Sequence, residues 1–331
     1  MASLHTKYLG LDLKSPIVAA SSGLTESLDG LKKFEDAGAG AVVLKSLFEE
    51  EILLEMKKST AKMSSQQFIY PETVGYYEDN DQDMLTVENY LKLLTDAKKS
   101  LNIPVIPSIN CITAEEWLHF PKTLESAGAD ALELNIFILP SDLNRTAKEN
   151  EQVYFDILKE VKSSVSIPVA VKISSYFSHL AQMLQKLDKA GADALVLFNK
   201  FYSPDFDIDN FEITNGNVLS AASDMATSLR WVSIMSNRLN CDVAASTGIA
   251  DGSAVVKQLL AGADAVQVAS AFYKHGIPYL SDMNDALEEW MDAKDFKTIA
   301  DFKGKMSQDQ SKNPAAYERV QFMKHFRGYS V

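Results

Sequence analysis

Small and hydroxylated residues follow two neighbouring apolar runs within the stretch 241–273, and their types suit the binding of a phosphate. The runs are residues 242–245 and 265–268, and the residues that follow them are Ser246, Thr247, Gly248, Ile249, Ala269 and Ser270. A glycine turn that leads into a helix leaves backbone N–H groups available to an anion. We therefore expect a phosphate to bind where these two runs end.

Lysines, carboxamides and serines follow other apolar runs of the chain. With the small residues beside them, they are Ala20, Ser21, Lys45, Ser46, Ser108, Asn110, Asn135, Lys172 and Asn199. Carboxamides donate and accept hydrogen bonds at the edge of a heteroaromatic ring, and a buried lysine stabilises negative charge on a reduced ring. Together with the phosphate site, this set predicts a heteroaromatic cofactor with a phosphate tail.

Lys172 also admits a different chemistry. A lysine at the end of a buried strand can form a Schiff base with a carbonyl substrate, so an aldolase-type lyase is an alternative to a redox enzyme. No group of His, Asp and Glu residues has the spacing of metal ligands, and the sequence therefore predicts no metal site.

An internal repeat sets the order of the expected strands. Its phrase, Ala-Gly-Ala, then Gly or Asp, then Ala and an apolar run, begins at Ala37, Ala127, Ala190 and Ala261. Each copy has the composition of a helix end, a glycine cap and a buried strand. The other strand-like runs, which alternate with the repeat, are residues 15–20, 103–108, 167–172 and 242–246. The chain therefore predicts eight strands.

Helical periodicity separates most of these runs, and this alternation is typical of a parallel α/β fold. Eight units favour a closed (β/α)₈ TIM barrel over a doubly wound sheet, whose Gly-x-Gly-x-x-Gly fingerprint the chain lacks. We expect one domain over residues 1–331. Loop insertions at about 47–102 and 201–228 should cover the C-terminal face of the barrel, and residues 281–331 should form a helical tail.

Composition limits the partners. A net charge of −13 argues against a nucleic-acid-binding surface. Cys111 and Cys241 are the only cysteines, too few for an iron–sulfur cluster in this chain or for a disulfide framework. The N-terminal residues do not read as a signal peptide, and no apolar run approaches about 20 residues. We therefore expect a cytoplasmic protein that acts on a small molecule and does not associate with a membrane.

The order of these motifs resembles the dihydroorotate dehydrogenase family, and its soluble class in particular, over roughly residues 4–280. The segments that carry the resemblance are residues 16–23, 43–46, 132–135, 169–172, 199, 246–249 and 269–270. The resemblance implies a TIM barrel that binds flavin mononucleotide (FMN) and transfers hydride between a C–C bond of the substrate and flavin N5. A homodimer is the expectation at the family level.

The resemblance also implies residue roles. Lys45 would lie near the N5 edge of the flavin and Lys172 at its pyrimidine edge, while Asn135 and Asn199 would face both flavin and substrate. Lys45, Asn135 and Asn199 would therefore act in catalysis. The full set of expected cofactor contacts is Ala20, Ser21, Lys45, Ser46, Asn110, Asn135, Lys172, Asn199, Ser246, Thr247, Gly248, Ile249, Ala269 and Ser270.

The substrate side departs from the family pattern. After its fourth strand the family reads approximately Asn-x-Ser-Cys-Pro-Asn and supplies a base, whereas residues 137–140 read Phe-Ile-Leu-Pro here. Residues 69–77 replace the family's asparagine-containing substrate loop. We therefore expect FMN binding but poor oxidation of dihydroorotate, with Tyr76 or Tyr202 as a candidate proton donor or, for each, a packing role in a lid.

Two other hypotheses stay open on sequence grounds. One is the Schiff-base lyase that uses Lys172. The other is a non-catalytic barrel that binds FMN or another phosphate ligand as a scaffold, although such a protein would not need two lysines and two asparagines facing the reactive ring.

Overall fold

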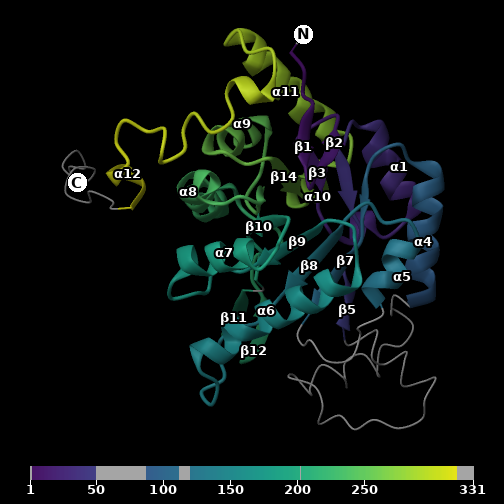
Figure 1. Ribbon diagram of the computed structural model, residues 1–331, viewed down its shortest axis with the longest axis vertical. Helices are drawn as coiled ribbons and strands as arrows, with labels where there is room; N and C mark the ends of the chain where they lie inside the picture. Colours follow the sequence, from purple (N-terminus) through teal and green to yellow (C-terminus); the bar gives the residue numbers. More distant parts are fainter. Residues whose placement is uncertain (1, 50–86, 112–119, 202, 319–331) are drawn as a thin grey trace.

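The computed structural model describes residues 2–49, 87–111, 120–201 and 203–318, and every structural statement below refers to these residues. Its main sheet is parallel throughout and has ten strands (Figure 1). They include the eight expected from the sequence, one of which is divided into β6 and β7, and the unexpected β5 at the start of the first insertion. The strands are β3 (Ile17–Ala19), β4 (Ala41–Val43), β5 (Leu47–Phe48), β6 (Val105–Ile106), β7 (Ser108–Cys111), β8 (Leu132–Ile136), β9 (Val169–Ile173), β10 (Ala194–Leu197), β13 (Asp242–Ser246) and β14 (Ala265–Val268).

The sheet closes into a barrel at a strand that Pro107 divides. In the strand order β6 and β7 stand at or near opposite ends, since β4 pairs with β6 while β7 pairs with β8 and β5. Yet β6 and β7 are separated in the chain by Pro107 alone, which lacks a backbone N–H for the ladder. The carbonyl of Pro107 still accepts from Glu133 N at 3.0 Å. The expected (β/α)₈ TIM barrel is confirmed.

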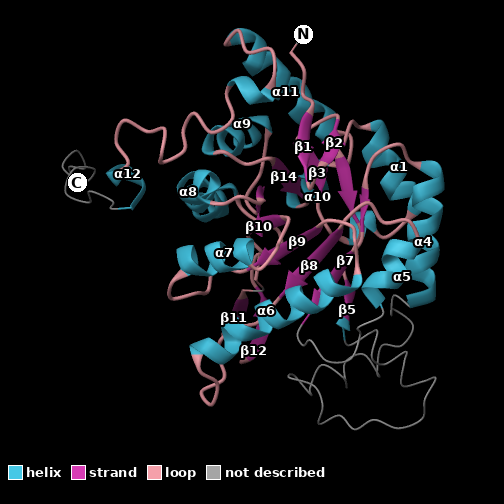
Figure 2. Ribbon diagram, viewed as in Figure 1, coloured by secondary structure: helices cyan, strands magenta, loops and turns pink. Residues whose placement is uncertain are grey.

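Helices cover the outside of this barrel (Figure 2). They are α1 (Leu28–Asp36), α4 (Val87–Ser100), α5 (Phe120–Ser126), α6 (Ala147–Ser164), α7 (Leu180–Lys189), α8 (Met225–Met235), α9 (Gly252–Ala261), α10 (Ser270–His275) and α11 (Tyr279–Ala293). Side chains that accept a hydrogen bond from the first turn fix several helix starts, such as Ser27 before α1 and Asp251 before α9.

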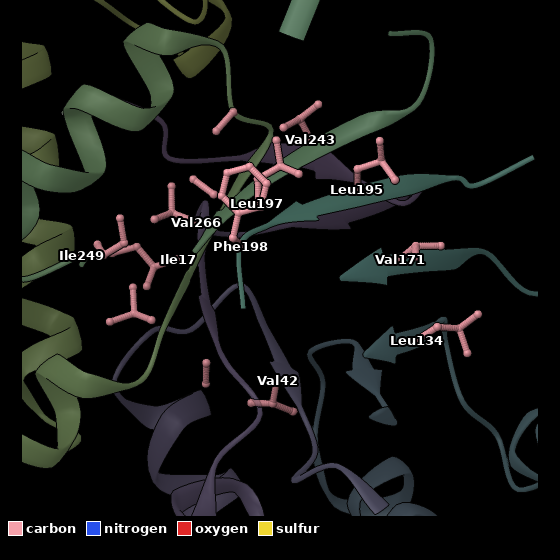
Figure 3. Packing of buried hydrophobic residues seen from close by; sticks show 14 of the residues in the cluster. Ile17, Val42, Leu134, Val171, Leu195, Leu197, Phe198, Val243, Ile249 and Val266 are labelled. Atoms are coloured by element: carbon pink, nitrogen blue, oxygen red, sulfur yellow. The ribbon is translucent and has the colours of Figure 1, made fainter. Parts of the chain in front are cut away.

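The outward side chains of the strands form the core between sheet and helices. Leu134, Val171 and Leu195 are paired in register on β8, β9 and β10 and are fully buried, and Figure 3 shows them with their equivalents on other strands. Burying one such side chain contributes roughly 1.5–3 kcal/mol. This alternation leaves every second residue facing the barrel interior, which is where the polar residues of the strands must meet.

The aspartate of the repeat joins neighbouring units. Asp130, Asp193 and Asp264 each accept a backbone N–H from the start of an adjacent strand and pair with a lysine from a helix or from the C-terminal segment. The N–H groups are those of Val105, Val169 and Val243, at 2.7, 2.7 and 2.8 Å, and the lysines are Lys98, Lys162 and Lys303. The repeat therefore encodes the same contact three times.

The first copy of the repeat has Gly40 in place of the aspartate, for a steric reason. A Cβ atom at Gly40 would lie 1.9 Å from the carbonyl oxygen of Ser15. Close backbone approach thus excludes any side chain at this position.

A hairpin closes the end of the barrel opposite to the site described below. It consists of β1 (Thr6–Tyr8) and β2 (Leu11–Leu13), which lie near the N-terminus at the top of Figure 1. Leu9 N donates to the Asp242 carboxylate at 2.7 Å. Burial, followed by the nearby Asp264 carboxylate, raises the pKa of Asp242.

The insertions and the tail differ from the expected boundaries. Helix α4 lies within the range 47–102 and packs on α1, so it is a barrel helix and the first insertion ends before it. The second insertion contains a hairpin, β11 (Pro204–Asp207) and β12 (Glu212–Asn215), and ends where α8 begins. Most of the first insertion, 50–86, lies outside the described residues.

The tail is helical only in part. Helix α11 ends at Ala293, and the described residues beyond it are turns apart from η6 (Ile299–Asp301) and α12 (Ala315–Glu318). Asp295 and Gly304 have φ values of +58° and +75°, which an α-helix cannot accommodate. The single domain over residues 1–331 stays a prediction.

Candidate active site

A cavity opens at the C-terminal ends of the barrel strands, and most of the expected cofactor contacts line it. Strand geometry explains this, because parallel strands bring their C-terminal ends to the same face of the barrel. The expected residues in its lining are Ala20, Ser21, Asn135, Lys172, Asn199, Ser246, Thr247, Gly248, Ile249, Ala269 and Ser270. Residues from both ends of the barrel's sequence thus share one site.

Three expected contacts lie close to the cavity but are not in its lining. Lys45 Nζ pairs with Glu26 Oε2 at 2.7 Å, and both side chains are partly exposed. Ser46 is buried beneath Ser21, since its N–H donates to Ser21 Oγ at 2.8 Å and its own Oγ lies 2.8 Å from Ser108 Oγ. Asn110 is buried on β7, in register with Asn135.

A tyrosine supports the serine cluster from outside the barrel. Tyr90 on α4 accepts the N–H of Ser108 at 2.9 Å and donates to its carbonyl at 3.1 Å. Burial raises the pKa of the Tyr90 phenol well above its usual value, so the phenol stays neutral and keeps its proton for this bond. Ser108, and through it Ser46, is therefore held in place by α4.

Lys172 belongs to a buried network that crosses the barrel interior. Its Nζ donates to Gln267 Oε1 on β14 at 2.9 Å and lies 3.6 Å from Glu133 Oε1 on β8. Gln267 Nε2 in turn donates to Glu133 Oε2 at 2.5 Å. Sequence reasoning missed Glu133 and Gln267. Their signal is a polar residue within a short buried strand, beside Asn135 in β8 and alone in β14.

Two carboxamides at the site have buried atoms without a partner among the described residues. These atoms are Oδ1 of Asn135, which can accept a hydrogen bond, and Nδ2 of Asn199, which can donate one. A buried polar atom without a hydrogen bond costs about 1–3 kcal/mol. Both residues line the cavity, so a ligand with polar ring edges could satisfy them.

The turn after β13 requires its glycine. Thr247 and Gly248 have φ values of +74° and +78°, and Thr247 Oγ1 donates to the Phe198 carbonyl at 2.9 Å. A Cβ atom at Gly248 would lie 2.1 Å from the backbone nitrogen of Met225 at the start of α8. Successive residues in this conformation direct backbone N–H groups toward one point, which suits an anion.

Ser220 is a site residue that sequence reasoning missed. Its Oγ accepts the Gly248 N–H at 3.1 Å, its own N–H donates to Ser270 Oγ at 2.9 Å, and its carbonyl accepts from Lys274 Nζ at 2.7 Å. Ser220 therefore bonds to both segments expected to hold the phosphate. It lies in a loop with no periodic pattern, so the sequence held no signal for it.

Aromatic residues stand where β8, β9 and β10 end. The rings of Phe137 and Phe201 stack with centroids 4.0 Å apart, and Tyr176 meets Phe201 edge to face at 4.9 Å. We call Phe137, Tyr176 and Phe201 the aromatic wall. Its members follow shortly after polar residues of the cavity, so it borders the expected substrate side.

A further lysine, Lys200, lines the cavity and pairs with Asp224 at 3.1 Å. Three lysines near the ends of strands thus each have a carboxylate partner. The pairs are Lys45 with Glu26, Lys172 with Glu133 and Lys200 with Asp224. Tyr76 and Tyr202, the candidate proton donors, lie outside the described residues.

Membrane-spanning helices and clusters of metal ligands are both absent from the part of the chain that the structure describes. None of its helices combines the length and the apolar character needed to cross a membrane. Nor do three or more of its His, Cys, Asp and Glu side chains gather in an arrangement that could hold a metal ion.

The chain is similar to known proteins over most of its length. The family model described as dihydroorotate dehydrogenase matches residues 3–291. A dihydroorotate dehydrogenase B (NAD(+)), catalytic subunit, of Thermoplasma volcanium is 26% identical over 315 residues, covering 92% of this chain and 98% of the relative. The protein of the same name from Methanocaldococcus jannaschii is 25% identical over 304 residues, 86% of this chain and 96% of the relative. A putative dihydroorotate dehydrogenase A (fumarate) of Aeropyrum pernix is 26% identical over 306 residues, 91% and 96% of the two chains.

Proposed function

Because the chain belongs to the dihydroorotate dehydrogenase family, we propose that it binds FMN and acts as an oxidoreductase on a C–C bond of a small substrate other than dihydroorotate. The observation that carries the proposal is the convergence of the expected cofactor contacts on one cavity, with Lys172 fixed in its floor. FMN, when bound, supplies hydride acceptance and donation at N5.

The residues of the cavity fit an FMN molecule. The unpartnered Asn135 Oδ1 and Asn199 Nδ2 complement the N–H and C=O groups at the edge of a flavin ring. The turn at Gly248 would present its backbone N–H groups to a phosphate that displaces Ser220 Oγ, the acceptor of the Gly248 N–H. The close approach of this turn to α8 leaves no room for a side chain at Gly248. Lys172 would bind the pyrimidine edge, because it lies in the cavity and its stem is held by buried neighbours.

The substrate side supports a molecule that differs from dihydroorotate. Dihydroorotate carries a carboxylate, yet Lys45, Lys172 and Lys200 already have carboxylate partners. The aromatic wall offers flat apolar surface in the place where the family has a base. We therefore propose an uncharged, planar substrate, such as a cyclic enone, that packs against the wall. The proton donor is a tyrosine of the flanking loops, Tyr76 or Tyr202.

The Schiff-base lyase is the weaker candidate. A lysine that forms a Schiff base attacks a carbonyl through a nitrogen lone pair, whereas Lys172 Nζ is placed against Gln267 Oε1 and Glu133 Oε1, which suits an ammonium group. Borohydride trapping of a carbonyl substrate on Lys172 would favour the lyase. A non-catalytic FMN scaffold stays the third candidate, and failure of every electron donor and acceptor to change the flavin spectrum would favour it.

For the assembly, we propose a cytoplasmic homodimer in which this chain holds no iron–sulfur cluster. The relatives named B are catalytic subunits by name, so a second kind of subunit is the alternative. Sedimentation of the purified chain alone measures whether it forms a homodimer. An absorbance spectrum of the same sample shows whether it holds an iron–sulfur cluster.

The experiment that tests the function begins with the purified protein. The protein should be yellow, or the apoprotein should take up one FMN per chain. Photoreduced protein should then be reoxidised anaerobically by one or more uncharged cyclic enones or quinones. A colourless protein that cannot take up FMN would overturn the proposal.

A further inference from the structure

Glu133 is a carboxylate inside the barrel to which the proposed reaction gives no role. Its side chain is only 1% exposed, and it points inward from β8 between the outward Leu132 and Leu134. Oε2 accepts from Gln267 Nε2, while Oε1 has no hydrogen-bond partner among the described residues and lies 3.6 Å from Lys172 Nζ. The Lys172 ammonium is thus the charge that faces this oxygen.

The positions of the three side chains relative to the cavity differ. Lys172 and Gln267 are part of its lining, whereas Glu133 is not and lies one interior layer deeper, since Asn135 follows it on the same face of β8. A ligand on the cavity floor would therefore contact Lys172 directly. It would feel Glu133 only through the charge and position of Lys172.

Charge compensation explains why such a carboxylate is tolerated. A buried charge without a partner is strongly unfavourable, and a buried ion pair is stable only when its remaining polar atoms are bonded. Gln267 supplies those bonds to both members, accepting from Lys172 and donating to Glu133. The three side chains form one unit whose net charge is close to zero.

We propose that Glu133 is a positioning residue that lowers the reduction potential of the bound flavin by offsetting the charge of Lys172. A reduced flavin carries more negative charge on its pyrimidine edge than an oxidised one, so an uncompensated ammonium there favours the reduced form. The carboxylate behind the ammonium weakens this preference and fixes the direction of Nζ. The inference rests on the proposed function, because it requires FMN beside Lys172.

The test compares wild-type protein with Glu133→Gln, which keeps the shape and the bond to Gln267 but removes the charge. FMN content is measured first, so that a protein without flavin refutes the proposed function and not this inference. The ratio of reduced to oxidised flavin is then measured in equilibrium with a reference dye. In Glu133→Gln the ratio should rise by about tenfold at a fixed dye potential, which is ~30 mV for a two-electron couple. An unchanged or lower ratio overturns the inference.

Asp242→Asn is the matched control. Asp242 is also a partly buried carboxylate on a barrel strand, but it lies at the start of β13, at the opposite end of the barrel from the cavity. Its replacement should leave the ratio at the wild-type value. A rise equal to that of Glu133→Gln would show a general effect of net charge and would overturn the inference.

Two further variants keep the test decisive. If Glu133→Gln does not fold, Glu133→Asp replaces it, because this variant retracts the carboxylate from Lys172 by one methylene. The ratio of reduced to oxidised flavin should then rise by a smaller factor. An unchanged ratio would overturn the inference. In a Lys172→Met background, Glu133→Gln should have little effect on the ratio, because the buried carboxylate then has no cation beside it and favours its neutral form. An undiminished effect would mean that Glu133 acts on the flavin directly, which contradicts a positioning role.

Discussion

The proposed cofactor side and the proposed substrate side of the barrel mouth carry different kinds of residue. At the ends of β13 and β14 the chain has small residues, a glycine turn and backbone hydrogen bonds that one serine, Ser220, joins together. At the ends of β8 and β10 it has stacked aromatic rings within loops. Strand ends fix a backbone site closely, whereas loops tolerate replacement. A barrel can therefore keep one ligand site while the adjacent site changes.

The largest expected effect is the loss of FMN in Gly248→Ala. The new Cβ would lie 2.1 Å from Met225 N, and the φ of +78° costs roughly 1–3 kcal/mol for a residue other than glycine. The turn and the start of α8 would have to separate, which displaces the N–H groups predicted to hold the phosphate. Flavin content of the purified variant measures the effect.

Gly191→Ala is the control for that prediction. Gly191 also has a positive φ, +100°, but a Cβ atom at this position would have no neighbour within 4 Å, and Gly191 is not part of the cavity lining. The control should lose stability and retain FMN. Full FMN occupancy in Gly248→Ala would break the comparison, because the cofactor side would then not depend on its backbone geometry.

The second prediction concerns the aromatic wall. Phe137→Ala and Phe201→Ala should leave FMN bound but raise KM for any enone substrate by up to about tenfold, because each ring offers a planar substrate a face to stack on and such stacking contributes roughly 0.5–1.5 kcal/mol. Steady-state kinetics with the best oxidant from the screen measures KM. Loss of FMN from either variant would mean that the wall belongs to the cofactor side.

Ser220→Ala should have a smaller effect, on FMN affinity alone. Ser220 Oγ occupies the Gly248 N–H, and a net hydrogen bond is worth roughly 0.5–1.5 kcal/mol. If the phosphate must take this N–H over, the variant should bind FMN about two- to tenfold more tightly in a fluorescence titration of the apoprotein. Weaker binding by about the same factor would instead identify Ser220 Oγ as a phosphate ligand.

The smallest effect is expected in the frame that holds β9. Glu125 accepts hydrogen bonds from the N–H groups of Ser166 and Ile167 just before this strand. The bond from Lys122, followed by those from Ser166, lowers the pKa of Glu125 to about 2. Since the folded-state pKa of Glu125 lies below its ordinary value of 4.5, the contribution of this carboxylate to stability is complete above that value and is lost as pH falls from 4.5 to about 2.

Glu125→Gln should therefore be slightly less stable than wild type at about pH 7, and the difference should shrink toward about pH 3. Urea unfolding across this pH range measures the difference in the free energy of unfolding between variant and wild type. The flavin content of both proteins is measured as a control, so that they are compared at equal FMN occupancy. A difference independent of pH would show that the carboxylate charge is not what holds the start of β9.

The strands could be predicted from the sequence for a physical reason. Parallel strands that are buried on both faces are short apolar runs. The Ala-Gly-Ala repeat marks the starts of four of them and the other four runs alternate with it, so the positions of all eight expected strands could be predicted. The cavity lining followed from the strand ends by the same geometry. The lining serine Ser220 could not be predicted, because a loop residue has no period that reports its position.

Other features depended on contacts between distant residues. Glu133 and Gln267 stand 134 positions apart, and their bond depends on the barrel register that places both inward at the same height. A helical tail was expected over residues 281–331, yet the last long helix ends at Ala293 because the following backbone turns at Asp295. Local pattern does not contain such information.

In the function that we propose, the chain retains the flavin site of its family while its substrate site has changed. This proposal is tested most directly by mixing the FMN-loaded protein with dihydroorotate in the absence of oxygen and following the flavin absorbance. We expect a yellow protein with one FMN per chain whose flavin absorbance stays essentially unchanged over many minutes. Bleaching within seconds would contradict it, because the substrate side would then serve the family reaction after all.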